Sequence, residues 1–481
     1  MNNINLRDII IKRGSSIHDA MALIDKNAKG TLFVVGDDER LCGVVTDGDI
    51  RRGLIKGVTL KDKLTTVMNS SFVALKESVA FEDIADQLKA KYKYIPILDG
   101  NGRIVDYYSF IFNVRIPVAK PSLSGNEAKY LMECIATNWI SSQGKFVEKF
   151  ESQFAEYLGV RYALSTCNGT AALHLALEAL GIKEGDEVLV PALTFIATAN
   201  AVTYTGAKPI FCDSELDTFN INPRDLEKRL TERTKAIIPV HLYGQPAKMD
   251  EIMEIAKRND LYVIEDAAEA HGAEYKGNKV GTLGDVGIFS FYGNKIITTG
   301  EGGMLTTNNP KTYESVKKLR DHAMDENKKY WHNRVGFNYR MTNLQAAVGC
   351  AQLERIDDII KNKMEIMKRY DKYFKEIETL GLSPRNEFSK NVCWMYSLII
   401  DEKKNGFTRD SLMDHLLEKN IECRHFFYPI NEMPPYYDSQ ILPNAHYLSN
   451  SGMNIPSYAT ITKEEITNIS KIILKFINQG I

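Results

Sequence analysis

The chain has 481 residues, a formal net charge of −2 and 25% charged residues. This balance excludes the basic surface typical of nucleic-acid-binding proteins, and the length favours more than one domain. No apolar run is long enough to span a membrane, and the segment Met1–Asp8 lacks the pattern of a signal peptide. Seven cysteines without Cys-x-x-Cys pairs indicate reduced thiols in a cytoplasmic protein and argue against a structural zinc site.

Residues 1–115 are expected to form a separate α+β unit, because they contain an internal repeat. The stretches Val34–Thr46 and Ile97–Ser109 each predict a strand, a turn and a second strand. Helix-period stretches precede them at Ile17–Lys26 and Ala80–Ala90. Two such halves are expected to pack as a pair and to bury their faces against each other.

A linker with two prolines, Val114–Pro121, favours an extended path into a second unit. From residue 150 to 310, short apolar strands alternate with helical segments, which predicts a mostly parallel sheet covered on both faces. The expected strands are 186–190, 208–212, 236–240, 261–265 and 285–290, with a helix at 249–257.

The pattern changes after residue 350. One long amphipathic helix is expected over 342–380, followed by a smaller α/β region. That region is expected to hold a strand near 393–400 and a helix near 409–419. The prediction is therefore a large domain over 116–355 and a small C-terminal domain over 356–481.

Three segments of the large domain carry the chemistry. The stretch Phe289–Gly303 holds Lys295 after an apolar strand, and a lysine in such a place can form a Schiff base with an aldehyde cofactor. Asp266 ends a predicted strand, where α/β proteins bind ligands. Asn168–Leu177 is typical of a glycine turn that opens a helix and binds phosphate. A phosphate site, an acid and an amine in this order are what pyridoxal 5′-phosphate (PLP) requires.

Residues 116–481 are identified as a member of the DegT/DnrJ/EryC1/StrS family of sugar aminotransferases. The matching segments are Asn168–Leu173, Pro191–Val202, Glu265–Ala270, Phe289–Gly303 and Asn338–Met341. Within the family, the GDP-perosamine synthases are the most similar group in Trp139–Phe146, His241–Pro246 and Tyr330–His332. The resemblance implies a fold-type I PLP enzyme that moves an amino group from glutamate to C4 of a nucleotide-linked 4-keto-6-deoxy sugar. The expected acceptor is GDP-4-keto-6-deoxymannose, and the expected pathway is surface polysaccharide synthesis.

The same resemblance implies the cofactor site. Lys295 is expected to bind PLP covalently and then to move a proton, and Asp266 is expected to pair with the ring nitrogen. Further cofactor contacts are expected from Gly169, Thr170, Phe195, Glu269 and Ser290. Ordinary alternatives stay open: Asp266 can cap a helix, the glycine and threonine can be a plain helix start, and the phenylalanine can be a core residue.

Glu269 departs from many family members, which carry glutamine or histidine near the cofactor's ring hydroxyl. A carboxylate at that point needs a hydrogen-bond donor or a proton. The GDP-perosamine synthases share this residue, so we interpret it as a mark of the subgroup. The alternative is an ordinary helix carboxylate.

Substrate contacts are expected, from the resemblance, at Ser141, Ser142, Trp331, His332 and Arg424. The alternatives are a turn for the serines, interface packing for the aromatic pair and a solvated side chain for the arginine. An arginine suits the nucleotide phosphates because its guanidinium binds them bidentately. In the family, the asparagine at Asn338 reaches the PLP phosphate of the neighbouring subunit, which predicts an obligate homodimer with two composite sites.

The N-terminal unit resembles a pair of CBS domains. The motif is Gly43–Arg52, in which Thr46 and Asp49 match the positions that bind the ribose and phosphate of an adenosine ligand. The aligned positions in the second half are Ser109 and Phe112, so no more than one competent adenine-nucleotide site is expected. A role limited to packing or assembly is the alternative.

Other functions remain open. A UDP- or dTDP-linked 4-keto sugar is an alternative acceptor. Relatives with histidine in place of the lysine are keto-sugar dehydratases, and Lys295 argues against that chemistry. A third alternative is a non-catalytic regulator that senses nucleotides through the CBS pair. The presence of Asp266 and Lys295 argues against it, because a purely regulatory protein needs neither residue.

Overall fold

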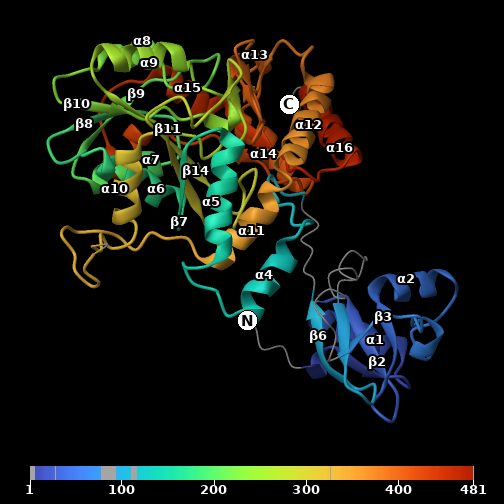
Figure 1. Ribbon diagram of the computed structural model, residues 1–481. Helices are drawn as coiled ribbons and strands as arrows, with labels where there is room; N and C mark the ends of the chain where they lie inside the picture. The colour runs from blue at the N-terminus through green and yellow to red at the C-terminus, as the bar shows by residue number, and fades with distance from the viewer. Residues whose placement is uncertain (1–5, 28, 77–93, 110–115, 326, 480–481) are drawn as a thin grey trace. The chain divides into compact units, whose positions relative to one another are not determined.

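The computed structural model describes residues 6–27, 29–76, 94–109, 116–325 and 327–479 (Figure 1). The chain divides into two compact units, Met1–Val114 and Arg115–Ile481. All seven cysteines are free. No helix among the described ranges combines the length and the apolar character needed to cross a membrane.

The first unit contains two three-stranded sheets of the same design. One consists of β1 (Ile10–Lys12), β2 (Thr31–Val35) and β3 (Leu41–Thr46), and the other of β4 (Leu75–Lys76), β5 (Tyr94–Leu98) and β6 (Ile104–Ser109). In each sheet the first pair is parallel and the second antiparallel, with a register shift at the equivalent place, Val34/Val35 and Ile97/Leu98. The two sheets join where the equivalent residues Arg40 and Arg103 form an antiparallel bridge.

The helices of this unit are α1 (Ile17–Asn27) and α2 (Asp47–Ile55), with the short 3-10 helices η1 (Leu6–Asp8) and η2 (Leu64–Thr66). The amphipathic α1 buries Ile17, Ala20 and Ile24 against the first sheet. The helix predicted at 80–90 lies outside the described residues.

The second unit is built on a seven-stranded sheet. Its order is β7 (Tyr162–Thr166), β15 (Gly303–Thr307), β14 (Val286–Ser290), β11 (Tyr262–Asp266), β10 (Thr234–Ile237), β8 (Glu187–Pro191) and β9 (Lys208–Cys212). β15 runs antiparallel to its two neighbours, and the other neighbouring pairs are parallel. The predicted mostly parallel sheet is confirmed. β10 ends before Pro239, which lacks the N–H that a central strand donates.

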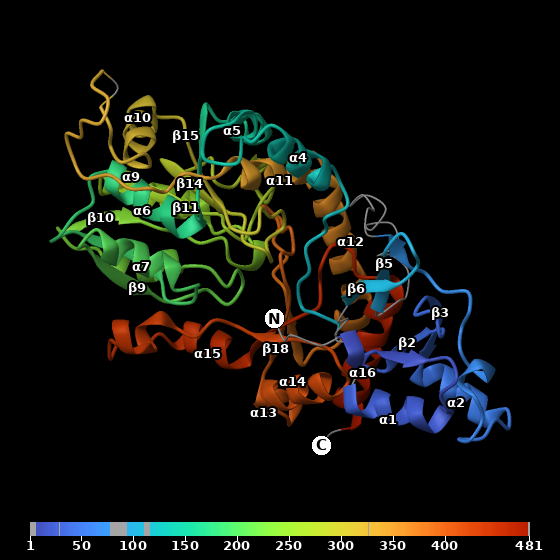
Figure 2. The same ribbon diagram turned by 90° about the horizontal axis from the view of Figure 1, so that it is seen from below.

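Helices lie on both sides of this sheet (Figures 1 and 2). They are α4 (Glu127–Ala136), α5 (Lys145–Leu158), α6 (Gly169–Ala179), α7 (Ala197–Tyr204), α8 (Pro223–Lys228), α9 (Met249–Arg258), α10 (Pro310–Leu319) and α11 (Asn343–Leu353). α6 packs on β14 and β15 beside α7 and α10, whereas α5 packs on β7 beside α11. α6 therefore lies over β14 and β15, and its first residue, Gly169, lies against Ser290 at the end of β14.

The long helix expected over 342–380 is wrong, because the chain forms two helices there, α11 and α12 (Ile356–Phe374). Arg355 leaves the helical conformation, with φ −121° and ψ 7°. Its guanidinium instead bonds the carbonyl of Ser122 and lies 3.5 Å from the carboxylate of Glu127. The apolar spacing continues across this break, so periodicity alone does not reveal it.

The C-terminal region adds an antiparallel sheet in the order β16 (Leu380–Leu382), β18 (Tyr396–Ile400), β20 (Gly452–Ile455) and β19 (Arg424–His425). Its helices are α13 (Glu402–Asn405), α14 (Arg409–Glu418), α15 (Pro443–Ser451) and α16 (Lys463–Gln479). A small sheet joins β12 (Glu274–Tyr275), β13 (Asn278–Lys279) and β17 (Ser389–Lys390), and the 3-10 helices are η3 (Leu242–Gly244), η4 (Ile430–Glu432) and η5 (Pro434–Tyr436).

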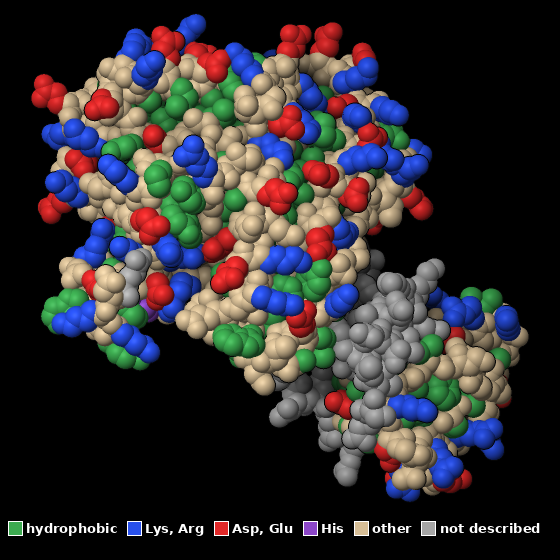
Figure 3. Space-filling view, viewed as in Figure 1, with side chains coloured by type: hydrophobic (Ala, Val, Ile, Leu, Met, Phe, Trp, Pro, Cys, Tyr) green, Lys and Arg blue, Asp and Glu red, His purple; other side chains and the backbone are tan. Residues whose placement is uncertain are grey.

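Two apolar clusters fill the second unit, one around the seven-stranded sheet and one between α12, α14, α16 and the C-terminal sheet. α12 contributes Ile356, Ile359 and Ile360 to the first cluster, and Met367 and Phe374 to the second. On the face of this unit seen in Figure 3, acidic and basic side chains are interspersed.

Candidate active site

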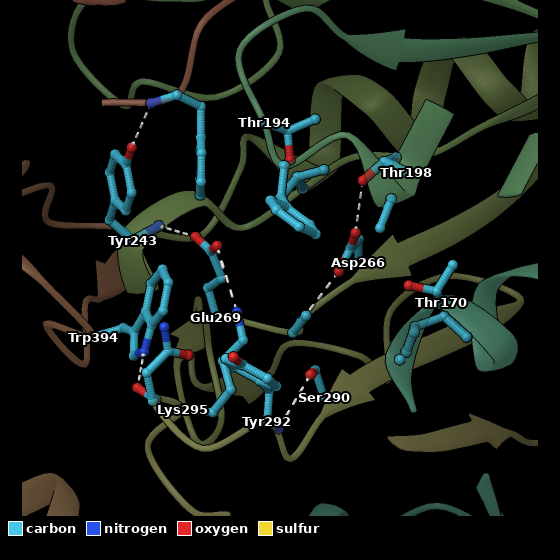
Figure 4. A pocket seen from close by; sticks show the side chains of 18 of the residues that line it. Thr170, Thr194, Thr198, Tyr243, Asp266, Glu269, Ser290, Tyr292, Lys295 and Trp394 are labelled. Carbon is cyan, nitrogen blue, oxygen red and sulfur yellow. Dashed lines mark hydrogen bonds and ion pairs between the residues drawn. The ribbon is translucent and has the colours of Figure 1, made fainter. Parts of the chain in front are cut away.

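A cavity of about 530 Å³ opens where β11 and β14 end and α6 begins (Figure 4). Such a place, at the carboxyl ends of parallel strands, is where open α/β sheets bind ligands. The cavity lining includes seven residues that were predicted to hold the cofactor: Gly169, Thr170, Phe195, Asp266, Glu269, Ser290 and Lys295. The fold therefore brings together four segments that are far apart in the sequence.

The start of α6 has the features of an anion site. Asn168 caps the helix, since its side chain accepts the N–H of Ala171 at 2.8 Å. Gly169 lies against Ser290, and a Cβ on this glycine would come within 3.0 Å of the serine Cβ. The first N–H groups of a helix have no acceptor within it, so those of Gly169 and Thr170 suit a phosphate. The Ser290 hydroxyl lies at the same edge of the cavity.

Asp266 supplies a buried carboxylate at the end of β11, with 5% of the residue exposed. It accepts hydrogen bonds from the Thr198 hydroxyl at 2.9 Å and from the Ala268 N–H at 3.2 Å. Burial raises the pKa of Asp266, because the charged form loses its hydration. A buried carboxylate is costly without a cationic partner, and the protonated ring nitrogen of PLP is such a partner. The residues of this cavity thus fit PLP at both its phosphate and its ring nitrogen.

Lys295 points toward a second carboxylate (Figure 4). Its Nζ lies 3.6 Å from Oε1 of Glu269 and 4.1 Å from the centroid of the Trp394 ring. The other carboxylate oxygen of Glu269 accepts the N–H of Tyr243 at 2.9 Å. Burial raises the pKa of Glu269, and the nearby lysine opposes this effect. Glu269 therefore has the donor that a carboxylate at this point requires.

Tyr243 makes that hydrogen bond from a left-handed backbone conformation, with φ 54°. Such a conformation is uncommon for a bulky residue and costs free energy. The residue is buried, and its hydroxyl accepts the N–H of Phe427 at 3.2 Å. Hydrogen bonds at the backbone N–H and at the side-chain hydroxyl of Tyr243 thus hold this strained conformation. In this conformation the N–H of Tyr243 is directed at Glu269.

One wall of the cavity is a row of aromatic rings, Trp394, Tyr243, Phe427 and Phe195. Successive ring centroids are 6.1, 5.6 and 5.9 Å apart. Phe195 is 57% exposed, so it is not a core residue, and its position suits the predicted contact with a cofactor ring. This contact stays a prediction.

The predicted substrate residues are not all in this cavity. Arg424 lines it from β19, 3.7 Å from the carboxylate of Glu422. The described residues that line the cavity do not include Ser141, Ser142, Trp331, His332 or Asn338. Trp331 instead bonds Asn333, and His332 contacts the carbonyl of His322. The roles of these five residues stay predictions.

Several lining residues were missed from the sequence, namely Thr198, Tyr243, Trp394, His425 and Asn454. Thr198 lies in the matching segment Pro191–Val202, three residues after Phe195. Because residues three apart lie on the same side of a helix, the sequence could have indicated that Thr198 also faces the cavity. Tyr243 lies in the matching segment His241–Pro246 and His425 follows Arg424, so both could also have been indicated, whereas Trp394 and Asn454 have no recognisable motif near them.

In the first unit, Thr46 caps α2 in a capping box with Asp49. The Thr46 hydroxyl donates to the Asp49 carboxylate at 2.7 Å, and Arg52 donates to the other oxygen at 2.7 Å. The pair predicted to bind an adenosine ligand is therefore adjacent, and it also has a purely structural task.

Comparison with known proteins agrees with this geometry. The model of the DegT/DnrJ/EryC1/StrS aminotransferase family matches residues 121–474, and the CBS domain model matches residues 3–56. The chain is 46% identical over 362 residues to the GDP-perosamine synthase of Escherichia coli O157:H7, covering 75% of this chain and 98% of the relative. It is 48% identical over 358 residues to the GDP-perosamine synthase of Caulobacter vibrioides, covering 74% and 96%.

Solved structures give the same result. The aminotransferase TlmJ from Streptoalloteichus hindustanus matches with a TM-score of 0.71 and 28% identity, over 74% of this chain and 97% of that one. Helicobacter pylori PseC, an aminotransferase involved in the biosynthesis of pseudoaminic acid, matches with a TM-score of 0.72 and 27% identity, over 76% and 100%. The predicted fold-type I architecture and the PLP cofactor are confirmed. The chain belongs to the DegT/DnrJ/EryC1/StrS aminotransferase family of PLP-dependent enzymes.

Proposed function

We propose that this enzyme transfers an amino group from glutamate to C4 of GDP-4-keto-6-deoxymannose and forms GDP-perosamine in the cytoplasm for surface polysaccharide. The observation that best supports amino transfer is that Lys295, Asp266 and the start of α6 line the same cavity. The relatives named GDP-perosamine synthase support the choice of substrate, since the match covers 98% and 96% of their length.

The residues divide the work of amino transfer among them. PLP, when bound, supplies a conjugated ring that withdraws electrons from the carbon that loses or gains a proton. Asp266 keeps the ring nitrogen protonated, and the N-terminus of α6 with Ser290 holds the phosphate. Lys295 would hold the cofactor through its Nζ and would move the proton at the carbon that reacts. Glutamate takes up the oxygen of one water and leaves as 2-oxoglutarate, and the keto oxygen of the sugar leaves as another water.

The decisive experiment offers purified, PLP-loaded protein glutamate together with GDP-, UDP- or dTDP-linked 4-keto-6-deoxy sugars. Mass spectrometry identifies the aminated product, and 2-oxoglutarate is measured in parallel. Amination of the GDP sugar alone supports the proposal. Amination of another sugar alone keeps the enzyme class and rejects the substrate, and no 2-oxoglutarate with any acceptor rejects catalysis through Lys295.

We further propose that the enzyme is a homodimer in which Asn338 serves the neighbouring subunit's cofactor phosphate. Asn338 is not among the described residues that line its own cavity. Large apolar side chains on and after α4 are exposed by half or more: Met132, Ile135, Trp139 and Ile140. Exposed large apolar side chains that gather on one face are typical of a protein interface.

For the N-terminal unit, we propose an adenine nucleotide at Thr46 and Asp49. The matching CBS domain at 3–56 and the adjacency of the two side chains support this site. Thermal shift with AMP, ADP and ATP tests it, with Asp49→Ala as the variant that abolishes the shift. No shift with any nucleotide in the wild type leaves the unit with packing or assembly as its role.

A further inference from the structure

A second, much smaller cavity adjoins the active site. Its volume is about 20 Å³, which is enough for one water molecule. Its lining includes Asn294, Lys295, Lys363, Trp394, Tyr458 and the segment Ala119–Ser122. Asn294, Lys295 and Trp394 also line the large cavity, so these three residues form the wall between the two spaces.

Lys363 enters this small cavity from the middle of α12, with 5% of the residue exposed. Its Nζ donates to the carbonyl of Trp394 at 2.8 Å and to the carbonyl of Ser457. No carboxylate among the described residues forms an ion pair with it. Burial lowers the pKa of Lys363 to about 8, because the ammonium loses its hydration. An ammonium has three donors, so one N–H is left for the cavity.

Asn294 offers a matching acceptor. Its Oδ1 is buried and has no hydrogen-bond partner among the described residues. A buried polar atom without a partner costs free energy, and an ordered water commonly satisfies it. Lys363, with a spare donor, and Asn294, with a free acceptor, therefore both line a space that is large enough for one water.

Trp394 connects this pair to the catalytic lysine. Its backbone carbonyl is held by Lys363, and its indole N–H donates to the carbonyl of Asn294 at 2.8 Å. The face of the same indole lies 4.1 Å from Nζ of Lys295. Lys363 and Lys295 thus contact the same residue, one at its backbone carbonyl and the other at its ring.

We propose that Lys363 is a positioning residue for Lys295. It holds Trp394 through the backbone carbonyl and Asn294 through one water in the small cavity, and so fixes the wall between the two spaces. The inference rests on the proposed role of Lys295 and adds a residue from α12 that the active-site cavity does not contain.

The test compares Lys363→Met, which keeps the side-chain length and removes the donors, with Lys368→Met on the exposed side of the same helix. Lys368 pairs with Glu365 at 2.8 Å and does not line either cavity. With Lys363→Met, we expect the pH midpoint of the visible absorption of the PLP-loaded protein to shift by about 0.5 or more. We also expect kcat to fall roughly tenfold while KM for glutamate stays within about twofold. Lys368→Met should leave all three unchanged.

A lower Tm with an unchanged pH midpoint and kcat would mean that Lys363 is merely structural, and the proposal would fail. Asn294→Ala keeps the test sharp if Lys363→Met does not fold. On its own, Asn294→Ala should shift the midpoint by about 0.5 or more. Where Lys363→Met folds, both variants should shift the midpoint in the same direction, and the double variant should add little to either single change. If the shifts of the two single variants simply add in the double variant, Lys363 and Asn294 act independently and the proposed water bridge between them is wrong.

A crystal structure of the cofactor-free protein gives a readout independent of catalysis. We expect a water within about 3.2 Å of both Lys363 Nζ and Asn294 Oδ1. A direct contact between the two atoms, or a cavity without density, would overturn the bridge. A wild-type protein without a visible lysine-bound band would instead reject the role of Lys295 itself.

Discussion

The carboxylate of Glu269 lies 3.6 Å from the ammonium of Lys295, and the two side chains are 5% and 12% exposed. Opposite charges at this distance and depth stabilise each other much more than on the surface. The pair links Lys295, the residue proposed to hold the cofactor, to the strained backbone of Tyr243. Glu269 therefore makes two contacts with different parts of the site: an ion pair with Lys295 and a hydrogen bond with the backbone N–H of Tyr243.

Replacing Glu269 by Gln tests this link. The amide still accepts the N–H of Tyr243, but the buried charge is gone. Because burial raises the pKa of Glu269, the wild-type carboxyl contributes stability when protonated, and this contribution is lost as pH rises through the raised pKa. We expect the variant's Tm advantage in the cofactor-free protein to grow from pH 5 to pH 8, and kcat to fall about tenfold. Thermal melts across this pH range check the sign, and a constant difference would contradict it.

Asp266→Asn should separate stability from function. The amide keeps polar partners for Thr198 and Ala268 and removes a carboxylate whose pKa burial raises. We expect the cofactor-free Tm to rise by about 1 to 3 °C. PLP should be retained less tightly, and kcat should fall on the order of 10² to 10³, because the ring nitrogen loses its charged partner. Calorimetry and PLP titration measure the two effects.

The neighbouring Glu265→Gln is the contrasting control. Its carboxylate accepts the N–H groups of Gly281, Leu283 and Gly284 and contacts the ring of His241 at 3.1 Å. Hydrogen bonds to a charged acceptor are among the strong ones, so this change should lower stability by about 2 kcal/mol. A gain of stability in both variants would show that the hydrogen bonds to Glu265 are not stabilising.

Gly169→Ala should weaken PLP binding about tenfold, since the new methyl group comes within 3.0 Å of the Ser290 Cβ. The serine must then move at the phosphate site. Gly14→Ala is the control, because an added Cβ there meets no atom within 4 Å. Equilibrium dialysis of PLP measures the loss, and equal affinity of both variants would show that the close approach is unimportant.

Mixed dimers test the contribution of Asn338. A Lys295→Ala subunit paired with an Asn338→Ala subunit contains one intact composite site, so the purified heterodimer should have about half of the wild-type activity. Each parent homodimer should have little. Lys295→Ala paired with Asp266→Asn is the control and should stay inactive, because both residues belong to the same subunit's cavity. No recovery in the first pair would place Asn338 in its own subunit's site, and full activity of the Asn338→Ala homodimer would place it outside both sites.

The sequence predicted the parts of the site that local chemistry determines. Asp266 and Lys295 follow strands, and Gly169 begins a helix, so the sheet brings them to one edge. Tyr243 and Trp394 were missed because their roles arise from tertiary contacts, one through a left-handed backbone and the other through a ring face.

The break between α11 and α12 was missed for a different reason. Apolar spacing reports which side of a helix is buried, and that side stays the same across the break. What ends the helix is the remote contact of Arg355 with Ser122 and Glu127. Contacts between residues this far apart in the chain leave no periodic signal.

α12 contributes Ile356 and Ile360 to the cluster around the seven-stranded sheet, and Tyr370 and Phe374 to the cluster of the C-terminal region. Because α12 is part of both clusters, unfolding of this helix removes apolar contacts from both at once. Residues 115–481 should therefore unfold in a single cooperative transition. Amide hydrogens in the C-terminal sheet should exchange with solvent at rates set by the same global opening as those in β11.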